Sequence, residues 1–155
     1  MYGVEAAYMQ GPFSVQAEYA LSDASRDGAS DEDFSAYYVQ VGWTLTGESR
    51  SYKGSDGEFK RLKPANKFSP GASGGWGAWE LAARYDHADM NSGDINGGEV
   101  TAFTVALNWY VNETVRVMAD YRTAIDVEPR AGLIANSSSD LEDIDTFTLR
   151  GQWAF

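Results

Sequence analysis

Apolar residues alternate with small or polar residues along most of this chain, with a period of two. Successive side chains of a β-strand point to opposite faces, so this period predicts strands; the 3.6-residue period of an amphipathic helix is not evident. Each alternating segment has about the 9 to 11 residues that a tilted membrane strand requires. We expect seven strands, at residues 2–10, 13–21, 34–46, 78–87, 100–110, 115–123 and 147–155.

The two faces of these segments differ in polarity. One face is apolar, as in the run Phe103, Val105 and Leu107. The other face carries charged or amide side chains, namely Glu5, Glu18, Gln40, Glu80, Arg84, Asn108, Arg116, Asp120, Arg122, Arg150 and Gln152. A transmembrane β-barrel has this pattern, with lipid outside and water inside. A soluble β-sandwich alternates in the same way with its apolar face inside, so the pattern leaves both folds open.

The lengths of the connections favour the barrel, because outer-membrane barrels have short periplasmic turns and longer external loops. We place the end of the C-terminal strand at the periplasmic rim. The turns at 11–12 and 111–113 are then periplasmic and short, and the connections 22–33, 88–99 and 126–144 are external and longer. The connection at 47–77 is expected to be periplasmic, and its length breaks the rule.

Aromatic residues also sort to the strand ends, as rings at a membrane interface do. The rings expected near the periplasmic ends are Phe13, Trp43, Trp79, Trp109 and Trp153, and those expected near the external ends are Tyr19, Tyr37, Tyr85, Tyr121 and Phe147. A soluble core has no reason to separate tryptophan from tyrosine in this way. The sorting favours an all-β, antiparallel transmembrane barrel, with a soluble all-β ligand-binding module as the alternative.

Composition and charge narrow the function. Sixteen glycines, nine tyrosines, seven phenylalanines and five tryptophans suit strands and turns. A net charge of −11 disfavours binding to nucleic acid. No cysteine and one histidine, His87, leave little for a zinc site or a Ser-His-acid triad, so we expect no enzyme, metal or cofactor. We interpret the acidic clusters at 31–33 and 140–145 as solvated loops in preference to cation sites.

The long connection at 47–77 has a charge of its own. It holds six basic and three acidic residues, a net charge of +3, whereas the rest of the chain has 6 basic and 20 acidic residues and a net charge of −14. One interpretation is a solvated loop. The other is a loop folded into the barrel lumen, where clustered ammonium groups select anions and a flexible, hydrated lysine releases an oxyanion readily.

Several motifs, in order, resemble those of the phosphate-selective porin O/P family. They are GWTLTGE at 42–48, Lys63-Pro64, GAWELAARY at 77–85, LNWY at 107–110 and FTLRGQWAF at 147–155. The resemblance extends from about residue 34 to the end of the chain. It implies a sixteen-stranded, homotrimeric channel of the bacterial outer membrane that passes phosphate, pyrophosphate or related anions by diffusion.

By this resemblance, residues 1–155 form the C-terminal part of one barrel domain, about seven of its strands, with 47–77 inserted as a basic periplasmic or lumenal loop. The implied anion ligands are Lys60, Lys63, Lys67 and Arg61, and the implied pore-lining residues are Arg84, Arg116, Arg122, Arg150, Glu80 and Asp120. For the wall arginines, pairing with Glu80, Asp120 and Glu18 is the interpretation that we favour over direct anion contact.

The implied partners are small anions, outer-membrane lipid and lipopolysaccharide, and the barrel-assembly machinery, which would recognise the terminal Phe155. No cofactor is implied. A general porin on the same scaffold is the alternative function within transport, and the net acidity of the chain makes it worth testing.

Overall fold

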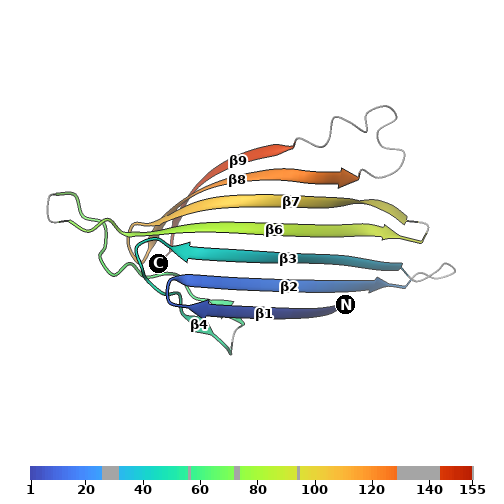
Figure 1. The fold of residues 1–155 in the computed structure, drawn as a ribbon, viewed down its shortest axis with the longest axis horizontal. Coiled ribbons are helices and arrows are strands. Elements are labelled where there is room, and N and C mark those ends of the chain that lie inside the picture. The colour runs from blue at the N-terminus through green and yellow to red at the C-terminus, as the bar shows by residue number, and fades with distance from the viewer. Residues whose placement is uncertain (26–31, 56, 72–73, 94, 129–143, 155) are drawn as a thin grey trace.

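The computed structural model describes residues 1–25, 32–55, 57–71, 74–93, 95–128 and 144–154, and it is all-β (Figure 1). Within these ranges no helix is long and apolar enough to cross a membrane. The strands are β1 (Tyr2–Gln10), β2 (Phe13–Ala24), β3 (Glu32–Thr44), β4 (Tyr52–Lys53), β5 (Glu58–Phe59), β6 (Ala78–Ser92), β7 (Ile95–Tyr110), β8 (Val115–Glu128) and β9 (Asp145–Trp153).

Seven of the strands form one antiparallel sheet in the order β1-β2-β3-β6-β7-β8-β9. All seven expected strands are therefore confirmed. Each pairs with its neighbour in the sequence, except that β3 pairs directly with β6 across the long connection. β4 and β5 form a separate two-stranded hairpin within that connection. β1 and β9 are the two edges of the large sheet, which is open, as one part of a barrel wall would be.

The expected external loop at 88–99 is wrong, because β6 and β7 continue through most of it. Asn91 pairs with Asn96 and Ser92 with Ile95, and Gly93 turns the chain with a φ of 50°. The Asn91 side chain accepts a hydrogen bond from the backbone N–H of Gly98 at 3.0 Å. Polar side chains support the ladder here, and apolar alternation cannot detect such a stretch.

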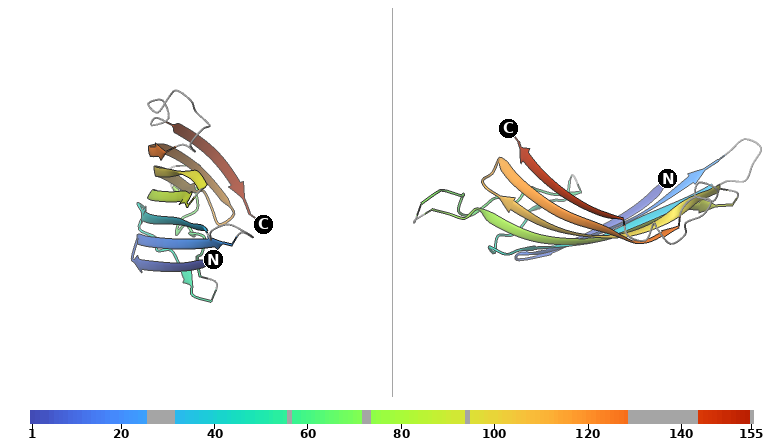
Figure 2. Two further views of the ribbon diagram at one scale, coloured as in Figure 1. Left: turned by 90° about the vertical axis from the view of Figure 1, so that its right-hand side faces the viewer. Right: turned by 90° about the horizontal axis from the view of Figure 1, so that it is seen from above.

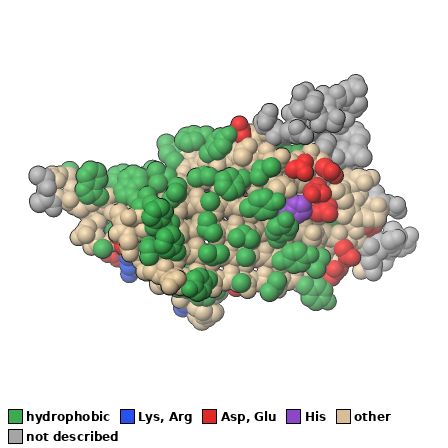
Figure 3. Space-filling view, in the orientation of Figure 1, with side chains coloured by type: hydrophobic (Ala, Val, Ile, Leu, Met, Phe, Trp, Pro, Cys, Tyr) green, Lys and Arg blue, Asp and Glu red, His purple; other side chains and the backbone are tan. Residues whose placement is uncertain are grey.

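The sheet is curved like a section of a cylinder wall (Figure 2). Hydrophobic side chains spread over the face turned to the viewer in Figure 1, which is the convex face (Figure 3). They are exposed: Leu81 is 40% exposed and Leu149 70%. No second sheet covers this face in the part of the chain that the structure describes, which argues against a sandwich. An uncovered apolar surface of this extent is suited to lipid contact.

Aromatic rings line the ends of the convex face. Phe13 stacks on Trp43 with 5.7 Å between ring centroids, and Trp79 stacks on Trp109 at 5.4 Å. These pairs are nearest neighbours across adjacent strands at the end of the sheet where β1 turns into β2. Toward the other end of the sheet, the ring centroids of Tyr37 and Tyr85 are 6.2 Å apart. The sheet thus has one tryptophan-rich and one tyrosine-rich rim.

Candidate functional site

The concave face is built around a buried carboxylate, Glu80 of β6, which is 1% exposed. Nε and Nη2 of Arg50 donate to its two oxygens, each at 2.6 Å. Asn108 and the Tyr110 hydroxyl each donate to Oε2 at 3.0 Å. Four hydrogen bonds compensate a carboxylate removed from water, which is the condition for burying such a charge. Glu80 faces inward as expected, but Arg50 covers it.

Arg50 belongs to the 47–77 connection, so its contact with Glu80 fixes that segment to the wall. Burial by itself would lower the pKa of Arg50, but the hydrogen bonds and charges of Glu80 and Tyr110 outweigh it and raise the pKa. The guanidinium therefore stays charged. Neither Arg50 nor its pairing with Glu80 was foreseen, although the position of Glu80 on the polar side of β6 could have suggested a basic partner.

The β4–β5 hairpin continues over the concave face toward the opposite edge of the sheet. Phe59 packs edge-on against Tyr52, 5.3 Å between centroids, and its ring lies 6.0 Å from the Arg50 guanidinium carbon. At the hairpin turn, Gly57 lies so close to Glu5 of β1 that a Cβ would come within 2.9 Å of the Glu5 carboxylate. The described residues of 48–61 thus lie over the concave face between β6 and β1, and the assignment of this face to a lumen stays a prediction.

Arg61 follows this hairpin and is half-buried. Its Nε and Nη2 have no hydrogen-bond partner among the described residues. The next residue, Leu62, is 1% exposed and packs with Ala78 and Tyr110, which closes the apolar cluster at the base of the segment. Lys60 donates to Glu58 at 2.5 Å on the hairpin itself. Nε and Nη2 of Arg61 are closed to solvent, so in this arrangement they do not face an open channel.

Lys63 and Lys67 lie elsewhere, at the turn that joins β7 to β8. Lys67 Nζ is 3.0 Å and Lys63 Nζ 3.9 Å from the carboxylate of Glu113, and the lysine side chains are 61% and 77% exposed. The hydrogen bond and charge of Lys67, with the charge of Lys63, lower the pKa of Glu113. The structure therefore separates this pair from Lys60 and does not bring the three lysines to one point.

The last part of the connection bends to the aromatic rim. The Phe68 backbone N–H donates to Val111 O at 2.8 Å, and its ring packs edge-on against Trp109 at 5.1 Å. Trp109 Nε1 donates to Trp76 O at 2.8 Å. Gly77 then returns the chain to β6 with a φ of 72°, where a Cβ would lie 2.4 Å from the Tyr110 carbonyl oxygen. The sequence analysis did not predict that the connection divides in this way, with its first part over the concave face and its last part at the aromatic rim.

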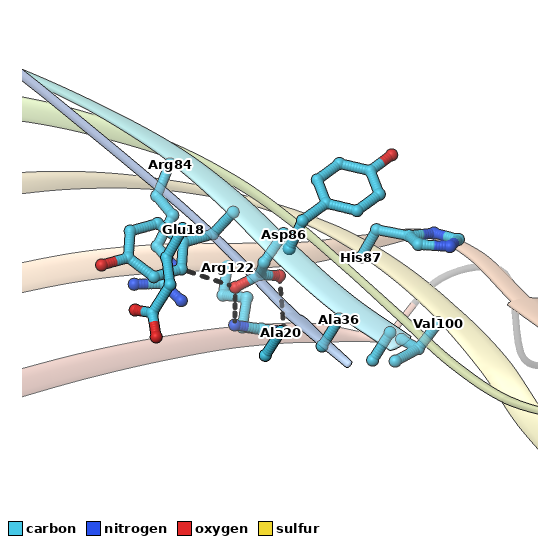
Figure 4. Close-up of a pocket in the computed structure, with 11 residues that line it drawn as sticks. Glu18, Ala20, Ala36, Arg84, Asp86, His87, Val100 and Arg122 are labelled. Atoms are coloured by element: carbon cyan, nitrogen blue, oxygen red, sulfur yellow. Dashed lines mark hydrogen bonds and ion pairs between the residues drawn. The ribbon is translucent and has the colours of Figure 1, made fainter. Parts of the chain in front are cut away.

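A second cluster on the concave wall centres on Asp86 of β6 (Figure 4). Arg122 of β8 donates to both of its oxygens, from Nη1 and Nη2, each at 2.9 Å, and Arg84 Nε lies 3.2 Å from Oδ1. The Arg84 guanidinium lies over the ring of Tyr38, 3.8 Å from its centroid. With Glu18, these residues line a hollow of about 330 Å³.

Two of the wall arginines are thus paired, but the partner that we expected was wrong. The expected carboxylates were Glu80, Asp120 and Glu18, whereas Arg84 and Arg122 use Asp86. Asp86 lies on the same strand face as Glu80 and Arg84, so the alternation could have identified it. Side chains two strands apart meet here, as the concave curvature allows.

The remaining wall residues have weaker contacts. Arg116 donates to Gln152 Oε1 at 2.7 Å and to the Tyr110 hydroxyl at 3.3 Å. Arg150 and Asp120 face inward, and among the described residues neither has an ion pair or side-chain hydrogen bond. His87 points to the convex face and contacts Thr101 Oγ1 at 3.0 Å. The described residues contain no group of three His, Asp or Glu placed to hold a metal ion.

Comparison with known proteins agrees with this geometry. The family model described as "Phosphate-selective porin O and P" matches residues 1–155. The chain is 36% identical to Porin O of Pseudomonas aeruginosa over 100% of this chain and 35% of that protein. It is also 34% identical to an uncharacterized protein of Caulobacter vibrioides, over 77% of this chain and 23% of that protein. The chain thus spans about a third or less of the length of these relatives.

Proposed function

Because the chain belongs to the phosphate-selective porin O and P family, we propose that it forms part of the wall of an outer-membrane pore for small anions. One observation carries the proposal: a basic segment lies on the polar, concave face of a curved sheet whose convex face is apolar and uncovered. Lipid suits the convex face, and a water-filled lumen suits the concave one.

A complete pore needs more strands than this sheet contains. Unpaired backbone groups at the edges β1 and β9 are not tolerated in a lipid bilayer, so each edge must pair with another strand. We propose that the chain works within a closed barrel, which by resemblance assembles as a homotrimer in the bacterial outer membrane. Diffusion through such a pore requires no catalytic group or cofactor.

The finer proposal is that the permeating anion is phosphate or a related oxyanion. The basic residues that follow the hairpin support it, since the guanidinium of an arginine such as Arg61 binds oxyanions through paired hydrogen bonds. The hairpin that precedes Arg61 lies on the concave face, and we propose that Arg61 lies where the segment narrows the lumen. Lys60 supplies a second positive charge nearby in the sequence.

A general porin is the second candidate, and one observation favours it. Asp86 neutralises much of the charge of Arg84 and Arg122, so the wall itself is a weak anion attractor. Selectivity would then rest on the inserted segment alone.

The decisive experiment is conductance of a complete barrel that contains this chain, in planar bilayers. The reversal potential in a KCl gradient should show anion preference, and phosphate should block the chloride current at millimolar concentration or below. Cation preference would overturn the anion proposal. Anion preference without block by phosphate would favour the general porin.

A further inference from the structure

The unusual feature of the Asp86 cluster is its stoichiometry: one carboxylate serves two guanidinium groups. Arg122 makes a bidentate contact with it, and Arg84 approaches from the same strand. The side chains of Arg84 and Arg122 are 38% and 46% exposed, whereas that of Asp86 is 17% exposed. The arginines are therefore accessible from the hollow, and the carboxylate lies between them (Figure 4).

The contact that Arg122 makes with Asp86 is the one that arginine makes with a phosphate or carboxylate ligand. Two parallel N–H donors meet two oxygens, with the planar fork matching the anion. Arg84 is held in place because its guanidinium stacks on the Tyr38 ring, a contact that favours a cation. Asp86 thus fills, from within the protein, a place where two fixed guanidinium groups would otherwise hold an oxyanion.

We propose that Asp86 sets the anion affinity of this part of the wall by competing with the permeating oxyanion for Arg84 and Arg122. The inference rests on the proposed function. While an anion visits, Arg122 exchanges one carboxylate contact for an equivalent one, and when the anion leaves, Asp86 takes the donors back. The arginines are never left without a partner, so release costs little.

This arrangement meets a requirement of any selective pore. Binding must be favourable enough for entry and weak enough for exit. Two arginines without a counter-ion would bind phosphate tightly and slow its passage. With Asp86 and Glu18 present, the four charged side chains of the hollow have no net charge, so an anion gains the arginine donors without an excess of positive charge to trap it.

The test compares two neutralising substitutions in the complete pore. Asp86→Asn removes the competing carboxylate. Asp120→Asn removes an equal charge from the same concave face on β8, two strands from β6, where the described residues form no ion pair with Asp120. The readout is the phosphate concentration that halves the chloride current in a planar bilayer. We expect Asp86→Asn to lower this concentration about tenfold or more, and Asp120→Asn to change it less than about twofold, the effect of charge alone.

A third variant identifies the donor. Asp86→Asn combined with Arg122→Gln should return the half-blocking concentration to near that of the wild type. Equal shifts for Asp86→Asn and Asp120→Asn, or a shift that survives the loss of Arg122, would overturn the inference. If Asp86→Asn does not assemble, as judged by heat-modifiable migration in detergent gels, Asp86→Ser tests the same point with a smaller polar side chain.

The ion preference of the wild-type pore tests the proposed function independently of the Asp86 variants. A wild-type pore without anion preference contradicts the function whatever the variants do. A wild-type pore that prefers anions, with Asp86→Asn behaving like Asp120→Asn, contradicts only the role of Asp86.

Discussion

Arg50 and Glu80 meet 30 positions apart in the sequence, with Nε and Nη2 of the arginine each 2.6 Å from a carboxylate oxygen. The side chains are 18% and 2% exposed. Removing one partner of a buried pair leaves an uncompensated charge, which costs about 3 to 5 kcal/mol. The contact is therefore a strong attachment of residues 48–61 to the sheet.

We predict that Arg50→Met releases this segment. Trypsin should then cleave at Lys53 and Lys60 at least about tenfold faster in the detergent-solubilised barrel, and the pore conductance should rise as the lumen widens. Lys53→Met removes one positive charge from the same segment without exposing Glu80, and it is the matched control for cleavage at Lys60, the site that it keeps. The double substitution Arg50→Met with Glu80→Gln should unfold in denaturant later than Arg50→Met alone, because no bare carboxylate stays buried. Unchanged cleavage in Arg50→Met would contradict this role.

The basic residues of the segment should differ in their effect on selectivity. Arg61 is half-buried directly after the hairpin on the concave face, whereas Lys67 is paired with Glu113 at an exposed turn. We predict that Arg61→Gln lowers the anion-to-cation permeability ratio several-fold and that Lys67→Gln changes it less than about twofold, because water and salt screen an exposed charge at the rim. Reversal potentials measure both. A larger effect of Lys67→Gln would place the constriction at the rim instead.

The Glu113 carboxylate should titrate below its ordinary value of 4.5, because Lys67 and Lys63 favour its charged form. The pKa of Glu113 is lower in the folded than in the unfolded state, so the pairing makes its full contribution to folding stability above pH 4.5. That contribution is lost as the pH falls through the lowered pKa. Lys67→Gln should return the pKa toward 4.5, as carboxyl NMR of a Glu-labelled sample would show. The pair is exposed, so barrel stability should hardly change. A Glu113 pKa above 4.5 in the wild type would refute the pairing.

Adjacent residues of β7 offer a test of the two faces. Val105 lies on the convex face and is 37% exposed, and Ala106 points to the concave face. We predict that Val105→Arg destabilises the membrane-inserted barrel by about 2 to 4 kcal/mol, the cost of arginine facing lipid near the bilayer midplane. Ala106→Arg, opposite Asp120, should cost much less. Folding into lipid vesicles, followed by denaturant titration, measures the difference. Equal costs would mean that the faces are assigned wrongly.

The strands could be predicted because each one repeats a physical rule. Lipid on one side and water on the other impose alternation on every residue, so 2–10 and 115–123 were found without knowledge of their neighbours. The ends of the strands could not be predicted in the same way, because Asn91 and Gly93 extend the β6–β7 ladder with polar hydrogen bonds and a turn. The terminal Phe155, expected to be read by assembly machinery, lies outside the described residues, and that role remains a prediction.

The candidate site was predicted less fully, because its contacts join distant parts of the chain. Charge counting found the basic segment, but not that Arg50 reaches Glu80 or that Lys63 and Lys67 turn to Glu113. The pairing of Arg122 with Asp86 depends on curvature, which brings β6 and β8 side chains together over the intervening strand. No local pattern records how far a sheet is curved.

The direct pairing of β3 with β6 has a consequence for how such a protein changes over evolutionary time. Thr44 already pairs with Glu80, and the Leu45 N–H donates to Trp79 O at 2.8 Å, so the wall closes beneath the connection whatever the connection contains. Away from the anchoring residues Arg50, Leu62 and Gly77, substitutions, insertions and deletions within 47–77 can accumulate while the strands keep their register. The inserted connection can thus change in sequence and length during evolution while the lipid-facing strands stay the same.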